Sequence, residues 1–383
     1  MKYVLIFICA LIGVLLLGPG CGKKVADTST AGPIRIGANM ELTGSIATLG
    51  GGAKEGVLLA AEQRNAKGGV LGKQLEIIVL DNKSDATEAA NQTTKLIEKG
   101  VVAVLGPVTS GNCKAAAPIA QDEGVVLLSP TATNPDVTKI GDYIFRACFL
   151  DSYQGEAIAR FAGGTLKARR MAVLVENGND YARGLGEFAA KTFTAGGGTV
   201  VATEFYAKGE KDFASLLTKV KAKKPDVIVL PSYYDTVALC VKQAREMGIT
   251  APMMGGDGWD SPKLAEIAGK EALNNTYFTN HYSPEDVSPV VQNFVKSFKA
   301  KYGKVPDALA ALGYDAALML FDAIERAGAA DSKKIRDTLA ETKDFQGVSG
   351  TISMGKDRNP IKSISILALV DGKQTLKEKL APK

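Results

Sequence analysis

The sequence predicts an α/β protein made of two lobes, each a doubly wound parallel sheet. The chain has 383 residues, which is more than one ordinary domain contains and suggests about two. From residue 34 onward, short β-branched runs alternate with longer amphipathic runs, the pattern of parallel strands joined by helices on both faces of a sheet. The alternation starts again after about residue 150, so we expect a second unit of the same kind.

The first half contains four expected strands separated by helices. The strands are "IRIGA", "LEIIVL", "VVAVLG" and "VVLLS", and the helices cover residues 53–64, 87–98 and 115–122. Acidic residues in "DNKSDATE" resemble calcium ligands, but the spacing of an EF-hand is missing. We therefore expect an Asp or Ser of this stretch to cap the helix that follows.

The second half repeats the pattern and then changes. Helices are expected over 152–161, 182–195, 216–221 and 236–247, with strands at "RRMAVLVE", "TVVATEFY", "DVIVLPS" and "APMMGG". Beyond Thr276 the pattern turns helical, over 290–302, 308–326 and 333–341, before the strands "GTISM" and "SISILALV". The late helices need a sheet to cover, so the chain is expected to return to the first lobe and then cross once more. This predicts three crossings, with residues 34–149 and 280–355 in lobe 1 and residues 150–279 and 356–383 in lobe 2.

The amino terminus predicts export. Residues 3–17 are an apolar run of about fifteen residues, shorter than the roughly twenty that span a bilayer, so we expect a signal peptide over 1–20, with an uncleaved anchor as the alternative. The small residues before Cys21 resemble the lipobox of bacterial lipoproteins, although Gly18 stands where that pattern usually has leucine. This resemblance implies acylation of Cys21, and the polar residues 21–33 are typical of a flexible tether.

Composition and cysteine positions limit the function classes. The chain has a formal charge of +5, 46% hydrophobic residues and no basic stripe, so we expect no nucleic-acid partner. Beyond the signal region there are three cysteines and no CxxC pair. Their locations, in an exported protein, suggest a Cys113–Cys148 disulfide, whereas Cys240 is expected to be a buried apolar residue.

The residues that catalysis needs are scarce. The only histidine is His281, in the turn-like stretch "TNHYSPED", where we expect a solvated loop residue. A single histidine excludes most nucleophile–histidine pairs and imidazole-rich metal sites. Neither of the two glycine fingerprints for nucleotide phosphates occurs. We therefore expect that the protein is not an enzyme and that it binds neither a metal nor a cofactor.

Polar residues instead follow several predicted strands, at the edge where open α/β sheets bind ligands. Singly, these residues have ordinary structural explanations as helix caps and turns. Together, hydroxyls and helix N–H groups on one lobe and a lone acid with aromatic neighbours on the other are what a zwitterionic amino acid requires. The candidates are Ser110 and Gly111 in "VLGPVTSGN", Thr131 and Thr133 in "SPTATNP", Tyr181 in "NGNDYARG", Tyr233 in "LPSYY" and Asp257 in "MMGGDGW".

The chain also resembles the periplasmic leucine, isoleucine and valine binding proteins of ABC transporters, over nearly all of residues 34–370. The stretches that carry the resemblance are "AKGGVLGKQLEIIVLDN", "GPVTSGN", "SPTATNP", "LDSYQG", "GEKDFASLL" and "MMGGDG". The resemblance implies the type I periplasmic binding protein fold and a role for each candidate. Ser110 and Thr133 hold the ligand carboxylate, the Thr131 carbonyl and Asp257 hold its ammonium, and Tyr181 and Tyr233 close over it.

Two residues depart from the family pattern. Asp257 stands where the family's best-known members have glutamate, and Leu49 replaces a large aromatic residue of the first loop. A retained acid still argues for an amino group on the ligand, and Leu49 with the two tyrosines favours an apolar or partly aromatic side chain.

The resulting prediction is an extracytoplasmic solute-binding subunit of an ABC importer. It would bind a hydrophobic, most simply branched-chain, amino acid in the interlobe cleft and deliver it to a membrane permease. The predicted location is the periplasm or cell surface, with membrane contact through the lipid anchor only. Two alternatives stay open: a ligand-sensing receptor domain for an amino acid or small carboxylate, and an enzyme such as an amidase or dehydrogenase on the same fold.

Overall fold

The computed structural model describes residues 32–381. The signal peptide predicted over 1–20, the lipidation site Cys21 and nearly all of the tether lie outside the described residues. Within 32–381, none of the helices combines the length and the apolar character that a membrane crossing requires.

The first sheet has five strands in the order β2-β1-β3-β4-β5, and all of its pairs are parallel. Its strands are β1 (Ile34–Met40), β2 (Leu75–Asp81), β3 (Ala103–Leu105), β4 (Val126–Ser129) and β5 (Ile144–Arg146). The first four confirm the sequence prediction. Strand β5 was not predicted, because its three residues are too short a run to show a period.

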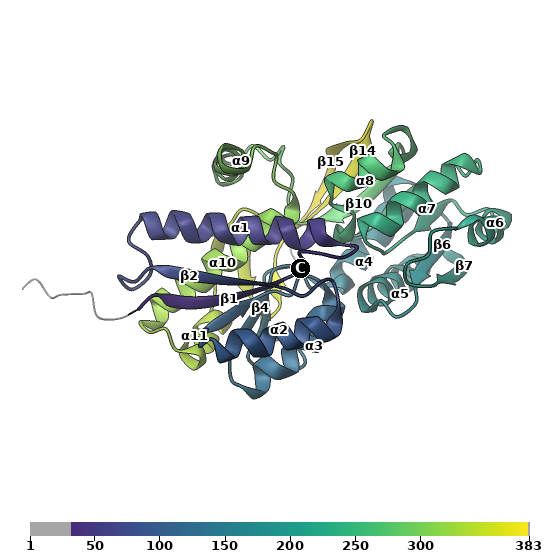
Figure 1. Cartoon of the computed structure of the whole chain (residues 1–383). Helices are drawn as coiled ribbons and strands as arrows, with labels where there is room; N and C mark the ends of the chain where they lie inside the picture. Colours follow the sequence, from purple (N-terminus) through teal and green to yellow (C-terminus); the bar gives the residue numbers. More distant parts are fainter. Residues whose placement is uncertain (1–31, 382–383) are drawn as a thin grey trace, which may run out of the picture. The chain divides into compact units, whose positions relative to one another are not determined.

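Helices cover both faces of this sheet (Figure 1). Strand residues alternate between the faces: Leu105 belongs to the core shared with α1 and α10, whereas Val104 packs with Leu96 of α2. Asp85 caps α2 by accepting the Glu88 N–H, which confirms the predicted cap. The helices of this lobe are α1 (Ala47–Ala66), α2 (Ala86–Glu98), α3 (Ser110–Asp122), α9 (Pro289–Tyr302), α10 (Ala308–Ala327) and α11 (Ser332–Ala340).

Helices α1 and α10 approach each other at glycines. A Cβ atom on Gly56 would lie 2.0 Å from the carbonyl oxygen of Ala310, and one on Gly313 would lie 2.2 Å from that of Ala53. Only glycine permits this backbone contact. The late helix α10 therefore packs on the first lobe, as the sequence predicted, and its first turn is held at a fixed place beside α1.

The second sheet has seven strands in the order β15-β14-β10-β9-β8-β6-β7. It is parallel from β7 to β10, but β14 runs antiparallel to β10 and β15 antiparallel to β14, so the sheet is mixed. The prediction that the chain turns helical beyond Thr276 was wrong for its first residues, since β10 begins there. The strands are β6 (Arg170–Glu176), β7 (Thr199–Tyr206), β8 (Val227–Val229), β9 (Met253–Gly255), β10 (Thr276–Asn280), β14 (Ile364–Val370) and β15 (Lys373–Leu380).

Helices also cover both faces of the second sheet. Val173 of β6 packs with Leu185 of α5, whereas Leu174 faces the core that includes Val237 of α7. The helices are α4 (Asp151–Arg160), which continues into a π-helical turn (Phe161–Thr165), α5 (Asp180–Ala195), α6 (Ala214–Ala222), α7 (Tyr234–Glu246), α8 (Pro262–Ala268) and two short 3₁₀ turns (Asp257–Trp259 and Glu271–Leu273). The predicted fold class, two doubly wound lobes, is confirmed, with the antiparallel edge as a correction.

The chain crosses between the two sheets three times: between β5 and α4, between β10 and α9, and through a small antiparallel sheet before β14. That small sheet consists of β11 (Phe345–Gly347), β12 (Gly350–Met354) and β13 (Pro360–Ile361). The buried Lys362 donates to Ser349 and lies 3.5 Å from the carbonyl oxygen of Ala147, so it links the third crossing to the first. Burial lowers the pKa of Lys362 to about 8.

The predicted Cys113–Cys148 disulfide is wrong in this structure, because both thiols are free and buried. Cys113 packs on the α3 side of the first sheet with Leu127, whereas Cys148 lies in the first crossing beside Arg146. Burial raises the pKa of both thiols to about 12, which keeps them protonated. Cys240 is also free and buried, as predicted.

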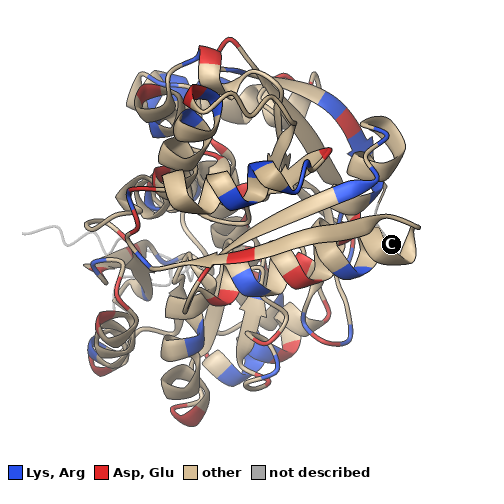
Figure 2. Ribbon diagram, turned by 90° about the vertical axis from the view of Figure 1, so that its right-hand side faces the viewer, with Lys and Arg blue, Asp and Glu red and all other residues tan. Residues whose placement is uncertain are grey.

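Charged residues of both signs are interspersed over the described ribbon (Figure 2). Most of the ion pairs are on the surface, such as Arg35 with Glu76 and Lys139 with Asp136. Pairs of this exposure contribute at most about 1 kcal/mol each, so the fold depends mainly on its apolar cores.

Candidate functional site

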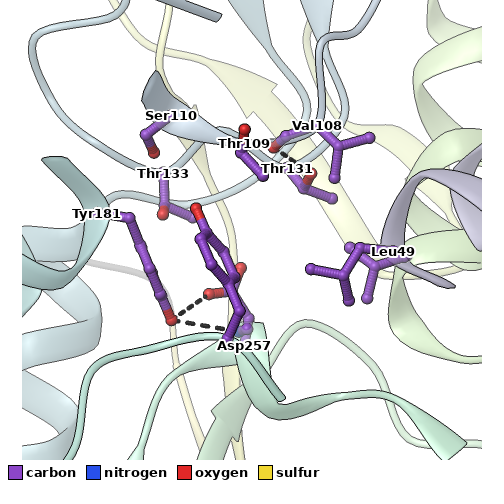
Figure 3. Close-up of a pocket in the computed structure, with 11 residues that line it drawn as sticks. Leu49, Val108, Thr109, Ser110, Thr131, Thr133, Tyr181 and Asp257 are labelled. Carbon is purple, nitrogen blue, oxygen red and sulfur yellow. Dashed lines mark hydrogen bonds between the residues drawn. The ribbon is translucent and has the colours of Figure 1, made fainter. Parts of the chain in front are cut away.

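A small pocket lies between the two lobes, at the carboxyl ends of strands from both sheets, with about 270 Å³ of empty space (Figure 3). Seven of the eight sequence candidates line it: Leu49, Ser110, Thr131, Thr133, Tyr181, Tyr233 and Asp257. Gly111 does not line it. Four lining residues were not among the candidates: Val108, Thr109, Gly258 and Leu309.

The lobe 1 side of the pocket is the amino-terminal end of α3. Ser110 is the first residue of the helix, so the N–H groups of the first turn lack partners within the helix and the helix dipole is positive there. The Ser110 hydroxyl oxygen accepts the N–H of Asn134 at 3.2 Å, which leaves the hydroxyl hydrogen available to donate. This end of the pocket is therefore suited to an anionic group.

A buried carboxylate holds the loop before α3 in place. Glu41 accepts the backbone N–H groups of Val108 and Thr109 at 3.1 and 3.0 Å, and the Thr109 hydroxyl at 2.9 Å. The Asn112 amide donates to the same carboxylate at 2.9 Å. Glu41 was missed in the sequence because it follows β1 with no motif around it.

The tract from residue 129 to 134 is fixed by its hydroxyls. Ser129 donates to the carbonyl of Pro107 at 2.6 Å and accepts the N–H of Ala132 at 3.0 Å. Thr131 donates its hydroxyl to the carbonyl of Val108 at 2.7 Å. The Ser129 and Thr131 side chains thus join this tract to the loop before α3, and the Thr133 side chain lines the pocket.

A buried arginine supports the same tract from behind. Arg146 of β5 donates to the carbonyl of Ala132 at 2.6 Å and to that of Asn134 at 2.8 Å. These two carbonyls flank Thr133, so the rigid guanidinium fork sets the backbone on both sides of it. Nothing in the sequence around Arg146 indicated this role.

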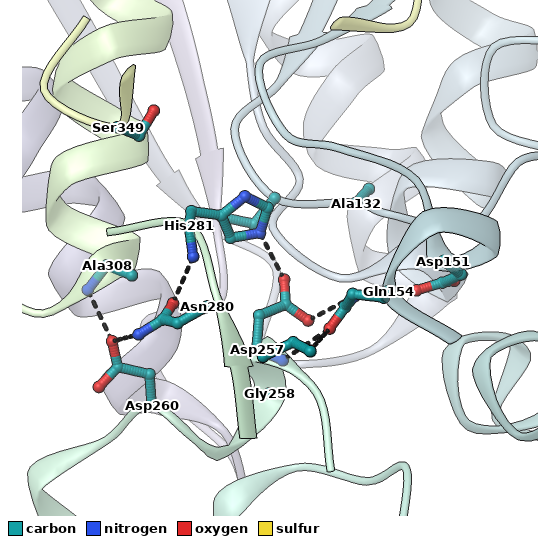
Figure 4. A network of polar contacts seen from close by, with 12 residues as sticks. Ala132, Asp151, Gln154, Asp257, Gly258, Asp260, Asn280, His281, Ala308 and Ser349 are labelled. Carbon is teal, nitrogen blue, oxygen red and sulfur yellow. Dashed lines mark hydrogen bonds and ion pairs between the residues drawn. The ribbon is translucent and has the colours of Figure 1, made fainter. Parts of the chain in front are cut away.

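The lobe 2 side of the pocket carries Asp257, in the 3₁₀ turn that follows β9. One carboxylate oxygen accepts the Tyr181 hydroxyl at 3.0 Å (Figure 3) and the Gln154 amide at 3.2 Å, and the other lies 2.9 Å from Nε2 of His281 (Figure 4). The Asp257 N–H in turn donates to Gln154 at 3.0 Å. Asp257 is therefore held from three sides and is the only charged residue among those lining the pocket.

The prediction that His281 is a solvated loop residue was wrong. It follows β10 directly, is only 3% exposed, and its ring stacks on that of Phe149 with centroids 3.5 Å apart and planes at 17°. Burial lowers the pKa of His281 to about 4, although the bond to Asp257 acts in the opposite direction. The imidazole is thus uncharged at neutral pH.

Two tyrosines form the floor of the pocket beside Asp257. Tyr181 and Tyr233 are stacked, with ring centroids 5.2 Å apart and planes at 18°. A Cβ atom on Gly258 would lie 3.0 Å from Tyr233 and 3.1 Å from Tyr181, so the glycine gives the rings their space. Burial raises the pKa of both phenols well above the ordinary value, which keeps them as hydrogen donors.

The remaining wall is apolar and comes from lobe 1. Leu49 lies in the first turn of α1, Leu309 in the first turn of α10 and Val108 before α3, and all three are buried. The close packing of α1 on α10 sets the first two side by side. Leu309 had no signal in the sequence, since it belongs to a helix more than 150 residues away from most other candidates.

Hydrogen bonds between the lobes flank the pocket. Lys114 of α3 pairs with the Asp180 carboxylate at 3.0 Å, and the Asn134 amide donates to the Asp180 carbonyl at 2.9 Å. At the other end, Tyr234 donates to the carbonyl of Ser45 at 3.0 Å, and the hydroxyls of Thr48 and Ser261 lie 2.9 Å apart. The two lobes are therefore in contact around the pocket.

The fold and the pocket define a two-lobed binding protein, with groups for opposite charges on facing lobes. Comparison with known proteins narrows this class. Residues 33–374 match the model of a family described as periplasmic binding protein. A Leu/Ile/Val-binding protein, BraC3, of Rhizobium johnstonii is 31% identical over 84% of this chain and 88% of its own length.

Two solved structures are similar over almost the whole chain. A leucine-binding protein, LivK, of Thermotoga maritima has a TM-score of 0.87 and 39% identity, covering 91% of this chain and 99% of its own. The branched-chain amino acid binding protein LivJ of Streptococcus pneumoniae, in complex with isoleucine, has a TM-score of 0.86 and 40% identity, covering 91% and 100%. The chain therefore belongs to the periplasmic binding protein family, in the branch of the branched-chain amino acid binding proteins of ABC transporters.

Proposed function

We propose that the protein is the extracytoplasmic solute-binding subunit of an ABC importer and that a branched-chain amino acid is its ligand. The observation that carries the proposal is the pairing of opposite sites across one small pocket. The positive end of α3 lies on lobe 1, and the Asp257 carboxylate lies on lobe 2. A small zwitterion satisfies both at once.

The ligand carboxylate is assigned to lobe 1. The Ser110 hydroxyl has its hydrogen free, and the first-turn N–H groups, including that of Gly111, belong to the same helix end. Thr133 adds a further hydroxyl beside them. Charge-assisted hydrogen bonds of this kind are about twice as strong as those between neutral groups.

The ligand ammonium is assigned to Asp257 and to the carbonyl of Thr131. The protein gives the Asp257 carboxylate only uncharged partners, namely Tyr181, Gln154 and the neutral His281. A buried carboxylate without a cation costs several kcal/mol, so a cationic group arriving with the ligand is stabilising.

The ligand side chain is assigned to the apolar wall of Leu49, Val108 and Leu309, and Tyr233 also lines the pocket. The pocket is small, which favours a compact ligand such as leucine, with about nine heavy atoms. LivJ of Streptococcus pneumoniae, which shares 40% identity, binds isoleucine.

The proposed role in transport depends on closure of the two lobes over the ligand. Because the ligand contacts both lobes, its binding favours the arrangement in which they meet, and that arrangement is offered to a membrane permease. The proposal further holds that the protein is exported, that Cys21 is acylated, and that this lipid alone attaches the protein to the membrane. No covalent step is proposed and no nucleic acid takes part.

A thermal-shift screen tests the ligand. The purified protein is melted with each of the twenty amino acids, and with 4-methylpentanoate and isoamylamine, which are leucine without its amino group and without its carboxylate. Leucine, isoleucine or valine should raise the midpoint most, and the two truncated compounds should have little effect. Stabilisation by 4-methylpentanoate equal to that by leucine would contradict the proposal, as would no response to any amino acid.

The membrane anchor needs a separate experiment in cells. The wild-type protein should partition with the membrane fraction and incorporate labelled fatty acid, and Cys21→Ser should do neither. Labelling of the Cys21→Ser variant at the wild-type level would contradict the proposed lipid anchor at Cys21.

A further inference from the structure

His281 occupies an unusual place in the fold. It is the first residue after β10, in the second of the three crossings, and its ring stacks on Phe149 of the first crossing. Lys362, which links the third crossing to the first, is near enough to affect the pKa of His281. The imidazole thus lies where the crossings meet, and it also contacts the acid of the pocket.

The hydrogen bond to Asp257 fixes the tautomer of His281. A carboxylate can only accept, so Nε2 of the neutral ring carries the hydrogen and donates it across 2.9 Å. Nδ1 is left as an acceptor, and it is buried with no hydrogen-bond partner among the described residues. The contact of His281 with the pocket is therefore made by Nε2 alone.

The charge balance around the pair is also specific. Tyr181 and Gln154 are the other donors to Asp257, and both are neutral. His281 therefore supports the carboxylate without cancelling its charge (Figure 4). The charged or titratable groups that interact with the pair are Asp151 of α4, Cys148 of the first crossing, Asp260 after the 3₁₀ turn, Lys362, Tyr181 and Tyr233.

We propose that His281 is a positioning residue for ligand binding: it aims the Asp257 carboxylate at the ligand ammonium and, by taking up a proton, makes acid compete with the ligand. This rests on the function proposed above and extends it. His281 does not line the pocket, so it acts through Asp257.

Competition follows from the charge of the pair. With one proton added, the His281–Asp257 pair is neutral overall, and the ligand ammonium has lost its counter-charge. The ammonium, once bound, opposes protonation of the pair to the same extent, because the coupling is reciprocal. Ligand affinity should fall on acidification, and a bound ligand should hold the pair unprotonated to lower pH. Burial, which lowers the pKa of His281 to about 4, sets this competition on the acid side of neutrality.

The test uses L-leucine as the probe and calorimetry at pH 7.0 and 4.0 on the full mature chain. His281→Gln keeps an amide donor that cannot gain a proton, and His281→Leu removes the donor at similar volume. At pH 7.0 we expect His281→Gln to bind within about threefold of wild type and His281→Leu at least about tenfold more weakly. Between pH 7.0 and 4.0 the wild-type affinity should fall about twofold more than that of His281→Gln, because a pKa of about 4 leaves half of the ligand-free protein with the extra proton at the lower pH.

Proton release separates this role from a purely structural one. At pH 4.0, titrations in two buffers of different ionisation enthalpy should show proton release on binding for wild type and less for His281→Gln. Equal pH profiles and equal proton release for these two proteins would overturn the inference, even if His281→Leu failed to fold. Wild-type protein that binds leucine no better than His281→Leu at pH 7.0 would overturn it as well. Wild-type protein that binds no amino acid at all would instead overturn the proposed function and the inference with it.

Discussion

The two sides of the pocket are built in different ways. On lobe 1, Ser110 begins α3 after the loop that follows β3, whereas Thr131 and Thr133 lie in the loop that follows the neighbouring strand β4. These two segments are braced largely by bonds between them. On lobe 2, one side chain, Asp257, supplies the charge, and its supports come from positions 24, 76 and 103 residues away. In the proposed complex, lobe 1 offers the ligand several neutral groups, whereas lobe 2 offers one charge.

This difference has an energetic consequence. On lobe 1, a single change leaves the helix end and the other hydroxyls in place, so each residue should matter moderately. On lobe 2, a single change removes the only charge, and no other lining residue can replace it. The effects of substitutions should therefore be unequal across the pocket.

The largest effect is expected on lobe 2. Asp257→Asn keeps the size of the side chain and removes its charge, and should weaken leucine binding by about 2–3 kcal/mol, as for the loss of a charge-assisted hydrogen bond. Calorimetry at pH 7.0 measures it. Affinity unchanged within error would mean that lobe 2 holds no cation, and the contrast between the two sides would disappear.

The burial of His281, which supports Asp257, should make the stability of the fold depend on pH. The folded pKa of His281 is about 4, below the ordinary 6.5, so below pH 6.5 the unfolded chain takes up this proton more readily than the folded one. This contribution is complete above pH 6.5 and is lost as the pH falls toward 4, amounting to about 2 kcal/mol by pH 5. Urea unfolding of the ligand-free protein at pH 7 and 5 measures it.

His281→Gln is the control for that measurement, because every other titrating group, including the buried Asp151, stays in place. The free energy of unfolding of wild type minus that of His281→Gln should be about 2 kcal/mol larger at pH 7 than at pH 5. An equal loss of unfolding free energy in the two proteins between pH 7 and pH 5 would show that protonation of His281 does not contribute to the pH dependence of stability.

A smaller effect is expected on lobe 1. Ser110→Ala removes one hydroxyl and leaves the N–H groups of α3, so leucine binding should weaken by about 1–2 kcal/mol. Ser215→Ala is the matched control, since Ser215 lies in α6, is exposed and does not line the pocket. A loss as large as that of Asp257→Asn would place a dominant group on lobe 1 as well.

The smallest effect is expected at the rim. Lys114 and Asp180 bridge the lobes, but each side chain is 28% exposed, so the pair should contribute at most about 1 kcal/mol. Lys114→Ala should mainly speed ligand release, which stopped-flow fluorescence can follow, and the effect should shrink in high salt. An unchanged release rate would show that closure does not depend on this bridge.

Most of the fold could be predicted from the sequence, because the periodicity of hydrophobic residues and the positions of turn residues are local signals. Helix α8 and strand β15 were missed as well, but two of the missed strands lack a local signal. Strand β5 has three residues, and β10 is a five-residue run directly before the proline-containing loop that begins at His281. The antiparallel edge formed by β14 and β15 depends on which way the chain returns after its last crossing, which no short pattern encodes.

The same distinction applies to the site. The lobe 1 residues were found because the loops that carry them follow predicted strands. Glu41 and Gln154 were missed because each acts on a segment far along the chain, and Arg146 because nothing in the sequence around it indicates its role. His281 was misread because its sequence neighbours are those of an exposed turn. The Cys113–Cys148 prediction failed because the locations of the two residues in the sequence did not reveal that their thiols face different surroundings.

The most direct test of the central claim, that the two lobes hold opposite charges of one small molecule, is the crystal structure of the complex with L-leucine. The account predicts the ligand carboxylate within about 3 Å of the Ser110 hydroxyl and of a first-turn N–H of α3, and the ammonium at a similar distance from Asp257. A ligand lying the other way round, or one whose ammonium makes no contact with Asp257, would contradict it.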